Sequence, residues 1–372
     1  MNKLKLTLII FSFFIFSAII TILLIYFPST NNPQEIPELK DILGDDQTAR
    51  LTAARKLAER VGVEEALEIL EKSSLPHTGE GHLVVHQIGF YAYSKYGIDS
   101  ILKCKDYFLY ACYHGAIIEA ASDGGFEAVT KMTDQCKSSS LQYFQCVHAA
   151  GHAILAMWDY DLPKALETCD DLYEKENRFP DALSSCHNGV FMENIFGVHD
   201  WGAGKETKRE WLSEDPYFPC NFFSEKYQKG CWLNQAARII EIHGGDIGKS
   251  TSTCEGIGND QHTFWCIDNI ARQIHPLTLG DPKKSFDLCQ QVGKKWQNDC
   301  ILINATAFYS VGGREEAIYI CSETPQNIKS ECYMRITEQI ISDSIDRNTK
   351  EETCNKMELP YRNQCVSGLD SS

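Results

Sequence analysis

Histidines are concentrated in the N-terminal half of this sequence, where their spacing could support metal binding. Eight of the eleven histidines lie before residue 200. His82 and His86 are four residues apart, and so are His148 and His152, so each pair would lie on one face of a helix. Two imidazoles at this spacing can bind the same metal ion.

Further candidate ligands occupy equivalent positions in successive segments. His114, His148 and His187 each lie one or two residues after a cysteine, while Glu119 and Glu193 each lie seven residues after one. The two glutamates could act as carboxylate ligands or as general bases. A mixed set of histidines and carboxylates would suit Zn, Fe, Cu or Mn without choosing among them. The predicted metal ligands are His82, His86, His114, His148, His152, His187, Glu119 and Glu193.

The cysteines indicate the elements that must position these side chains. From residue 220 to residue 354, every second cysteine is separated from the last by 34, 35, 32 and 33 residues. Such a period is typical of stacked helix pairs. Between Cys300 and Cys321, the pair Gly312-Gly313 ends one helix and Ala317 lies in the next. Glycine suits the position after a helix because that position often needs a positive φ.

The segment 300–321 resembles the tetratricopeptide and Sel1-like repeats. The resemblance depends on the period near 34 and on Ala305, Phe308-Tyr309, Gly312 and Glu315-Glu316-Ala317. It extends weakly from about residue 48 to the end of the chain. It implies an all-α fold, a right-handed α-α superhelical solenoid of about nine hairpins. The sequence departs from the family in carrying a cysteine pair per repeat and no consistent Trp or Pro.

Sixteen cysteines without any C-x-x-C motif favour disulfides over zinc ribbons or thioredoxin-like sites. Neighbouring cysteines would face each other across the turn that joins one helix pair to the next. The alternative, pairing within a hairpin, would leave Cys104 and Cys365 without partners. The predicted disulfides are Cys104–Cys112, Cys136–Cys146, Cys169–Cys186, Cys220–Cys231, Cys254–Cys266, Cys289–Cys300, Cys321–Cys332 and Cys354–Cys365.

The N-terminus predicts a membrane anchor. Residues 6–27 carry no charge and are long enough as a helix to cross a bilayer. Lys3 and Lys5 precede them, which places the N-terminus inside the cell. We expect an uncleaved single-pass signal anchor (residues 1–28), with cleavage as the alternative. A linker at residues 29–47 and an extracytoplasmic repeat domain at residues 48–372 would follow, outside the cytoplasm, where disulfides persist.

The repeat period breaks once, at an insertion over residues 195–219 that contains Trp201 and Trp211. It could form a lid over the histidines or a surface loop that packs its own aromatic residues. The net charge of −16 argues against nucleic acid as a partner.

Three functions fit these features. The first is binding of a transition metal or a small polar ligand on a His/Glu-lined face of the N-terminal half. The second is a protein-interaction scaffold without metal, with a protein partner on its concave surface, in which the histidines are ordinary packed residues. The third is a metal-dependent oxidoreductase or hydrolase, with Glu119 or Glu193 as the candidate catalytic base.

Overall fold

The computed structural model describes residues 36–370, apart from residues 78, 138–139, 177, 198–209 and 344. Within these residues every regular element is helical and no β-strand occurs. The elements are α2 (Pro37–Ile42), α3 (Gln47–Val61), α4 (Val63–Glu71), α5 (Glu80–Tyr96), the 3-10 helix η1 (Gly97–Lys103), α6 (Tyr107–Gln135), α7 (Ser140–Met157), α8 (Leu162–Tyr173), α9 (Ala182–Phe196), α10 (Glu225–Ile242), α11 (Ile247–Glu255), α12 (Asp260–Leu277), α13 (Pro282–Cys289), α14 (Gln297–Ser310), α15 (Arg314–Glu323), α16 (Gln326–Ser342), α17 (Arg347–Asn355) and α18 (Tyr361–Leu369).

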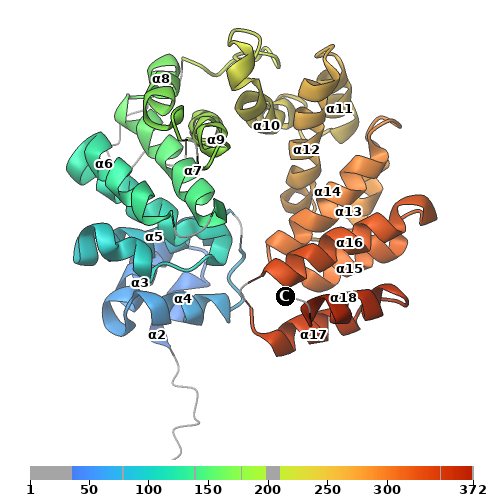
Figure 1. Cartoon of the computed structure of the whole chain (residues 1–372), viewed down its shortest axis with the longest axis horizontal. Helices are drawn as coiled ribbons and strands as arrows, with labels where there is room; N and C mark the ends of the chain where they lie inside the picture. Colours follow the sequence, from blue (N-terminus) through green and yellow to red (C-terminus); the bar gives the residue numbers. More distant parts are fainter. Residues whose placement is uncertain are drawn as a thin grey trace, which may run out of the picture.

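Most of these helices form pairs, and the pairs follow one another around an arc (Figure 1). The first helices of successive pairs contact each other in chain order, from α3 through α5, α6, α7, α9, α10, α12, α14 and α16 to α18. The helix α6 is itself a pair, because the backbone turns at Gly125, where φ is +61°. Glycine adopts this left-handed conformation without the steric cost that a side chain would add.

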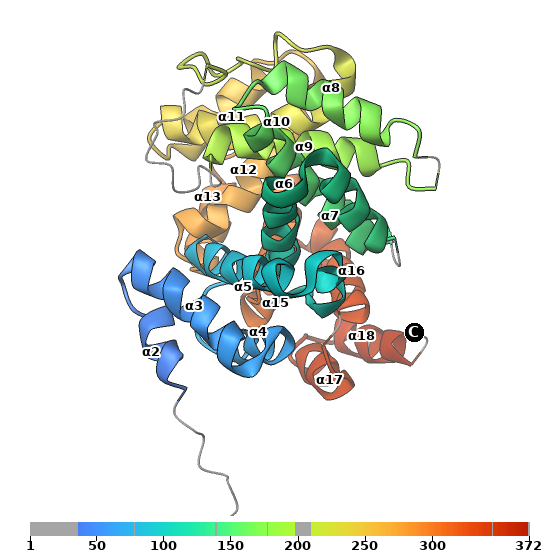
Figure 2. The same cartoon turned by 90° about the vertical axis from the view of Figure 1, so that its left-hand side faces the viewer.

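The arc brings the N-terminal helices α3 and α4 back toward the C-terminal helices α17 and α18 (Figure 2). The segment after α4 contacts the turn between α14 and α15. A Cβ atom added to Gly312 in that turn would lie 3.4 Å from Nδ1 of His77. The segment that follows α4 therefore packs against the C-terminal half of the chain at this point.

Eight disulfides hold the helix pairs together, and they join the cysteines that the sequence predicted as partners. Their Cα–Cα distances run from 5.5 to 6.4 Å. No free cysteine is found in the described part of the chain. Each bridge fastens one helix pair to the next, because its two cysteines lie on either side of the connecting turn.

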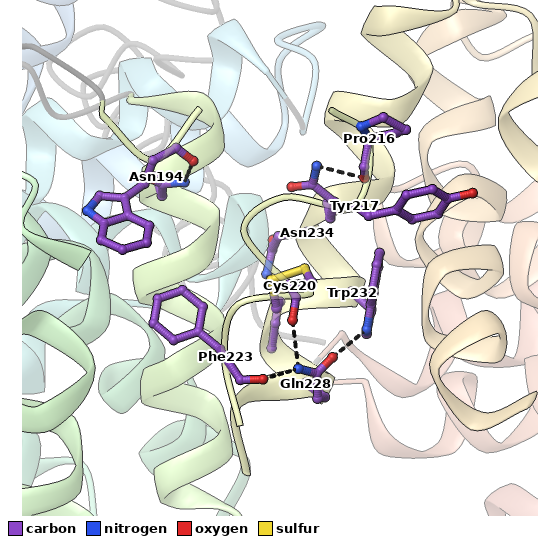
Figure 3. Close-up of a disulfide and its surroundings, with 12 residues drawn as sticks. Asn194, Pro216, Tyr217, Cys220, Phe223, Gln228, Trp232 and Asn234 are labelled. Carbon is purple, nitrogen blue, oxygen red and sulfur yellow. Dashed lines mark hydrogen bonds between the residues drawn. A yellow bond between two sulfur atoms is a disulfide. The ribbon is translucent and has the colours of Figure 1, made fainter. Parts of the chain in front are cut away.

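The surroundings of one disulfide show how a connecting segment is fixed in place (Figure 3). Gln228, on the first turn of α10, donates from Nε2 to the carbonyl oxygens of Cys220 at 2.8 Å and Phe223 at 2.7 Å. Its Oε1 accepts a hydrogen bond of 2.6 Å from the indole N–H of Trp232. The bridge from Cys220 to Cys231 therefore lies beside a turn that Gln228 holds through three hydrogen bonds.

The described ends of the predicted insertion pack against α9 and α10. Asn194 donates to the carbonyl oxygen of Trp211, and Gln235 donates to that of Pro216. Trp211 packs against the core as a partly buried side chain. The remainder of the insertion, residues 198–209, lies outside the described residues, so its role as a lid stays a prediction.

The N-terminal boundary of the folded region differs from the predicted one. Residues 37–42 were expected in a linker but form α2, because Leu39 and Ile42 pack on α3. Arg50 of α3 donates to the carbonyl oxygen of Ile42, and Arg60 forms two hydrogen bonds with Glu38. The predicted anchor at residues 6–27 lies outside the described residues. Among the described helices, none has the length and apolarity needed to span a membrane.

Candidate metal centre

Close helix crossings bring the histidine-bearing helices together. A Cβ atom on Gly89 of α5 would lie 2.2 Å from the carbonyl oxygen of Cys112 on α6. A Cβ atom on Gly115 of α6 would lie 2.2 Å from the carbonyl oxygen of His86 on α5. Only glycine permits this contact, since real Cβ atoms do not approach backbone atoms so closely. The imidazoles that flank the crossing are therefore held near one another.

The same crossing recurs between α7 and α9. There a Cβ atom on Gly151 would lie 2.3 Å from the carbonyl oxygen of Cys186, and one on Gly189 would lie 2.0 Å from that of His148. In both crossings a histidine lies three residues before the first glycine. The two crossings, α5 with α6 and α7 with α9, thus repeat one local arrangement. The histidines beside them form a single group, called here the histidine cluster.

The first group in this cluster consists of His82, His86 and His114. One ligand atom from each side chain lies within 4.8 Å of the others. The ring centroids are 4.5 Å apart for His82 and His86, 5.1 Å for His82 and His114, and 5.6 Å for His86 and His114. His86 and His114 are buried, while His82 is partly exposed. This group has the geometry to hold a metal ion.

Hydrogen bonding defines which nitrogen of His82 faces the group. Its Nδ1 lies 2.7 Å from the carbonyl oxygen of Phe108, to which only an N–H can donate. The proton is therefore on Nδ1, and the lone pair of Nε2 points toward Nδ1 of His114 at 3.2 Å. Phe108 has a φ of +52°, which is a strained conformation for a bulky residue. The backbone thus accepts strain where it orients a histidine.

The second group consists of His148, His152 and Glu193. Nδ1 of His152 lies 2.9 Å from Oε2 of Glu193, and Tyr160 donates to Oε1 of the same carboxylate at 2.6 Å. Nε2 of His152 lies 3.1 Å from Nε2 of His148. Glu193 is completely buried, and Tyr160 and His152 are 5% and 2% exposed. Tyr160 also has a positive φ, of +62°.

His114 lies between the two groups. Its ring centroid is 5.5 Å from that of His148 and 5.6 Å from that of His152. Burial lowers the pKa of His114 well below its usual value, and the four neighbouring histidines lower it further. Its Nε2 atom is buried and has no hydrogen-bond partner in the described part of the chain. The ring is therefore neutral and carries a polar atom that is not satisfied by protein.

The structure corrects the predicted ligand set at two positions. His187 lies outside the cluster, where its Nε2 is 2.9 Å from Asp170. Successive residues of a helix point about 100° apart, so His187 and Asn188 face different neighbours. Asn188 takes the position equivalent to His114 and accepts a hydrogen bond from Asn234. Glu119 is also outside the cluster. It lines an open groove of about 490 Å³ together with Arg55, Gln87 and Met157.

Some residues of the site were not predicted from the sequence. Tyr160 and the carbonyl oxygen of Phe108 orient histidines, but neither carries a local sequence signal. Gly89 and Gly151 could have been identified, since each follows a histidine by three residues on a first helix. Glycine at that position of a helix often marks a close approach of another backbone.

Comparison with known proteins does not assign a family. No family model and no curated protein matches this sequence. Among solved structures, an engineered protein with a crystal structure aligns with 90% of this chain and 98% of its own, at 14% identity and a TM-score of 0.23. A similarity of this size carries no argument about fold or function.

Proposed function

We propose that this protein binds a transition-metal ion through His82, His86 and His114. The observation that carries the proposal is that one ligand nitrogen from each of these three rings lies within 4.8 Å of the others. Within the group, Nδ1 of His114 faces the lone pair of His82 Nε2. Imidazole nitrogens that converge in this way, two of them from buried rings, form a donor set suited to a transition-metal ion.

The distance between two of the three ligand nitrogens agrees with metal ligation. Two bonds of about 2.0–2.1 Å at a tetrahedral angle place the two ligand nitrogens about 3.3 Å apart. The nitrogens of His82 and His114 are 3.2 Å apart. Metal binding also needs neutral imidazoles, and burial keeps His114 neutral. A donor set of three imidazoles favours Zn, Cu or Fe over Mn, which prefers oxygen ligands.

Binding is better supported than catalysis. Glu193 is fully buried and hydrogen bonded to His152 and Tyr160, and Glu119 lies outside the histidine cluster. Neither glutamate is placed to act as a general base toward an ion held by the first group. We therefore propose a metal-binding protein and assign no reaction to it.

Metal content tests the proposal. The purified full-length chain, stripped with chelator and then exposed to Zn²⁺, is expected to retain zinc after gel filtration. His82→Gln and His86→Gln are each expected to retain at least one equivalent of zinc less than the unaltered chain. His262→Gln is the matched control, because that histidine bonds to exposed Glu225 outside the cluster. Equal and negligible zinc in all four proteins would reject metal binding and favour the scaffold function.

We further infer that the helix pairs form a right-handed solenoid located outside the cytoplasm and attached by the N-terminal anchor. The contacts between successive first helices and the eight disulfides support this inference. In intact cells, a membrane-impermeant protease is expected to degrade the repeat domain, and the anchor is expected to remain in the membrane fraction. Protection of the domain, or a mature N-terminus near residue 28, would contradict it.

A further inference from the structure

We infer that the histidine cluster holds two metal ions, one on each side of His114, whose imidazole bridges them. This inference rests on the proposed function and extends it from one ion to two. The first ion would be bound by His82, His86 and Nδ1 of His114. The second would be bound by Nε2 of His114 together with His148 and His152.

In the second group, as in the first, one histidine has its Nδ1 beside an oxygen acceptor and its Nε2 beside another histidine. The carboxylate of Glu193 accepts the proton on Nδ1 of His152, so the lone pair of Nε2 of that ring points at His148. The two Nε2 atoms are 3.1 Å apart, close to the separation of two nitrogens on one ion. A histidine that donates from its other nitrogen to a carboxylate is the usual form of a metal ligand.

His114 can complete both groups because its two nitrogens face opposite sides. Nδ1 lies beside Nε2 of His82. If Nδ1 carries the proton and donates it there, Nε2 has only a lone pair, and that lone pair has no hydrogen-bond partner among the described residues. The rings of His148 and His152 lie as close to His114 as the ring of His86 does. A second ion bound at Nε2 would satisfy this lone pair.

Negative charge at the site would offset two of the four positive charges that two divalent ions bring. Two divalent cations in a buried site need compensating negative charge. Glu193 is completely buried beside His152 and would supply one negative charge. Bridging removes the proton from Nδ1 of His114 and releases it to solvent, so the bridging imidazolate supplies a second. Tyr160 holds the carboxylate in place through its hydrogen bond to Oε1.

Titration with Co²⁺ tests the inference, because bound cobalt can be counted by its visible absorbance and by elemental analysis. The metal-free full-length chain is expected to bind two equivalents. His82→Gln and His152→Gln are each expected to bind one. Glu193→Gln is expected to weaken the second equivalent by about 10–100-fold, as the loss of an orienting carboxylate usually does, and to leave the first unchanged. The control His262→Gln should bind two.

The outcomes separate this inference from the proposed function. One equivalent that His82→Gln removes and His152→Gln leaves intact would overturn the second ion while the proposed function stands. One equivalent lost in both variants would mean that a single ion uses the whole cluster, and would also overturn the inference. No binding by the unaltered chain would reject both. If His152→Gln does not fold, His148→Gln replaces it, since His148 is only partly buried.

The bridge has its own test. Two Cu²⁺ ions joined through one imidazolate are magnetically coupled, so the doubly loaded chain should give an EPR signal well below that of two separate ions. His114→Gln should lose the coupling. A full-intensity signal from two bound ions in the unaltered chain would overturn the bridge.

Discussion

At the scale of single residues, the site depends on partners that orient the imidazoles. Phe108 and Tyr160 both have positive φ values. The carbonyl oxygen of Phe108 accepts a hydrogen bond from His82, and the hydroxyl of Tyr160 donates to Glu193, the carboxylate beside His152. Strain of this kind costs about 1–3 kcal/mol and persists only where the surrounding structure imposes it. Leu109, Tyr110, Asp159 and Leu279 also have positive φ, so what distinguishes Phe108 and Tyr160 is their hydrogen bonds in the site.

Removing the hydroxyl group of Tyr160 tests how much its hydrogen bond to Glu193 contributes to the stability of the protein. Tyr160→Phe removes the 2.6 Å hydrogen bond to Glu193, a residue without solvent exposure. We expect the free energy of unfolding at pH 7 to fall by about 1–3 kcal/mol, because a buried carboxylate oxygen loses its donor. Urea unfolding with the disulfides intact measures this change. Tyr93→Phe is the control, since that hydroxyl bonds to Asp123 at the surface, and a change of similar size there would contradict the argument.

At the scale of helices, the cluster exists because two pairs of helices cross with their backbones almost in contact. The crossing glycines leave no space for side chains between α5 and α6 or between α7 and α9. Helix axes normally lie 8–10 Å apart, depending on the side chains at the contact. Glycine at the crossing brings the helices to the short end of that range, so rings on neighbouring helices can meet.

This packing predicts a large effect of a small substitution. In Gly151→Ala the new methyl group would lie 2.3 Å from the carbonyl oxygen of Cys186, so α7 and α9 must separate. We expect stability to fall by about 1–3 kcal/mol, as overpacking usually costs, and zinc binding to weaken. Gly248→Ala in α11 is the matched control, because its nearest neighbour is 3.5 Å away and alanine favours a helix. Thermal unfolding and zinc retention compare them, and equal effects would contradict this explanation.

At the scale of the whole molecule, the arc is closed by contacts between its two ends. Glu71 lies 3.5 Å from His77, and Arg314, Asp343 and Asp106 lie near enough to act on its charge. Burial raises the pKa of Glu71 from 4.5 to about 7, and it also lowers the pKa of His77. The contact therefore favours a neutral carboxyl group facing a neutral imidazole.

The raised pKa of Glu71 predicts that the contact around Glu71 and His77 weakens as pH rises. A group with a higher pKa in the folded state adds stability below its unfolded pKa, here 4.5, and that stability is lost as pH rises through about 7. Glu71→Gln should therefore match the unaltered chain near pH 4 and be more stable at pH 8, by on the order of 3 kcal/mol. Hydrogen exchange of residues 71–77 at both pH values measures this. A variant that is less stable than the unaltered chain at pH 8 would contradict it.

Much of the architecture was predictable because it depends on local spacing. The eight disulfides join cysteines only 8 to 17 residues apart, so each pairing depends on a single turn between helices. His82 with His86, and His148 with His152, share helix faces for the same reason. Within one repeat, short-range geometry determines which side chains are neighbours.

Tertiary structure decided what local spacing leaves open. Whether His187 or Asn188 faces the neighbouring first helix depends on a rotation of about 100°, and α8 and α10 determine it through Asp170 and Asn234. Glu119 and Glu193 occupy equivalent positions, yet within the described part of the chain only Glu193 is hydrogen bonded to both a histidine and a tyrosine. The contact of His77 with Gly312 depends on the summed curvature of every helix pair between them. The relative position of two residues this far apart depends on the angles between all the helix pairs that separate them. No single segment of the sequence determines those angles.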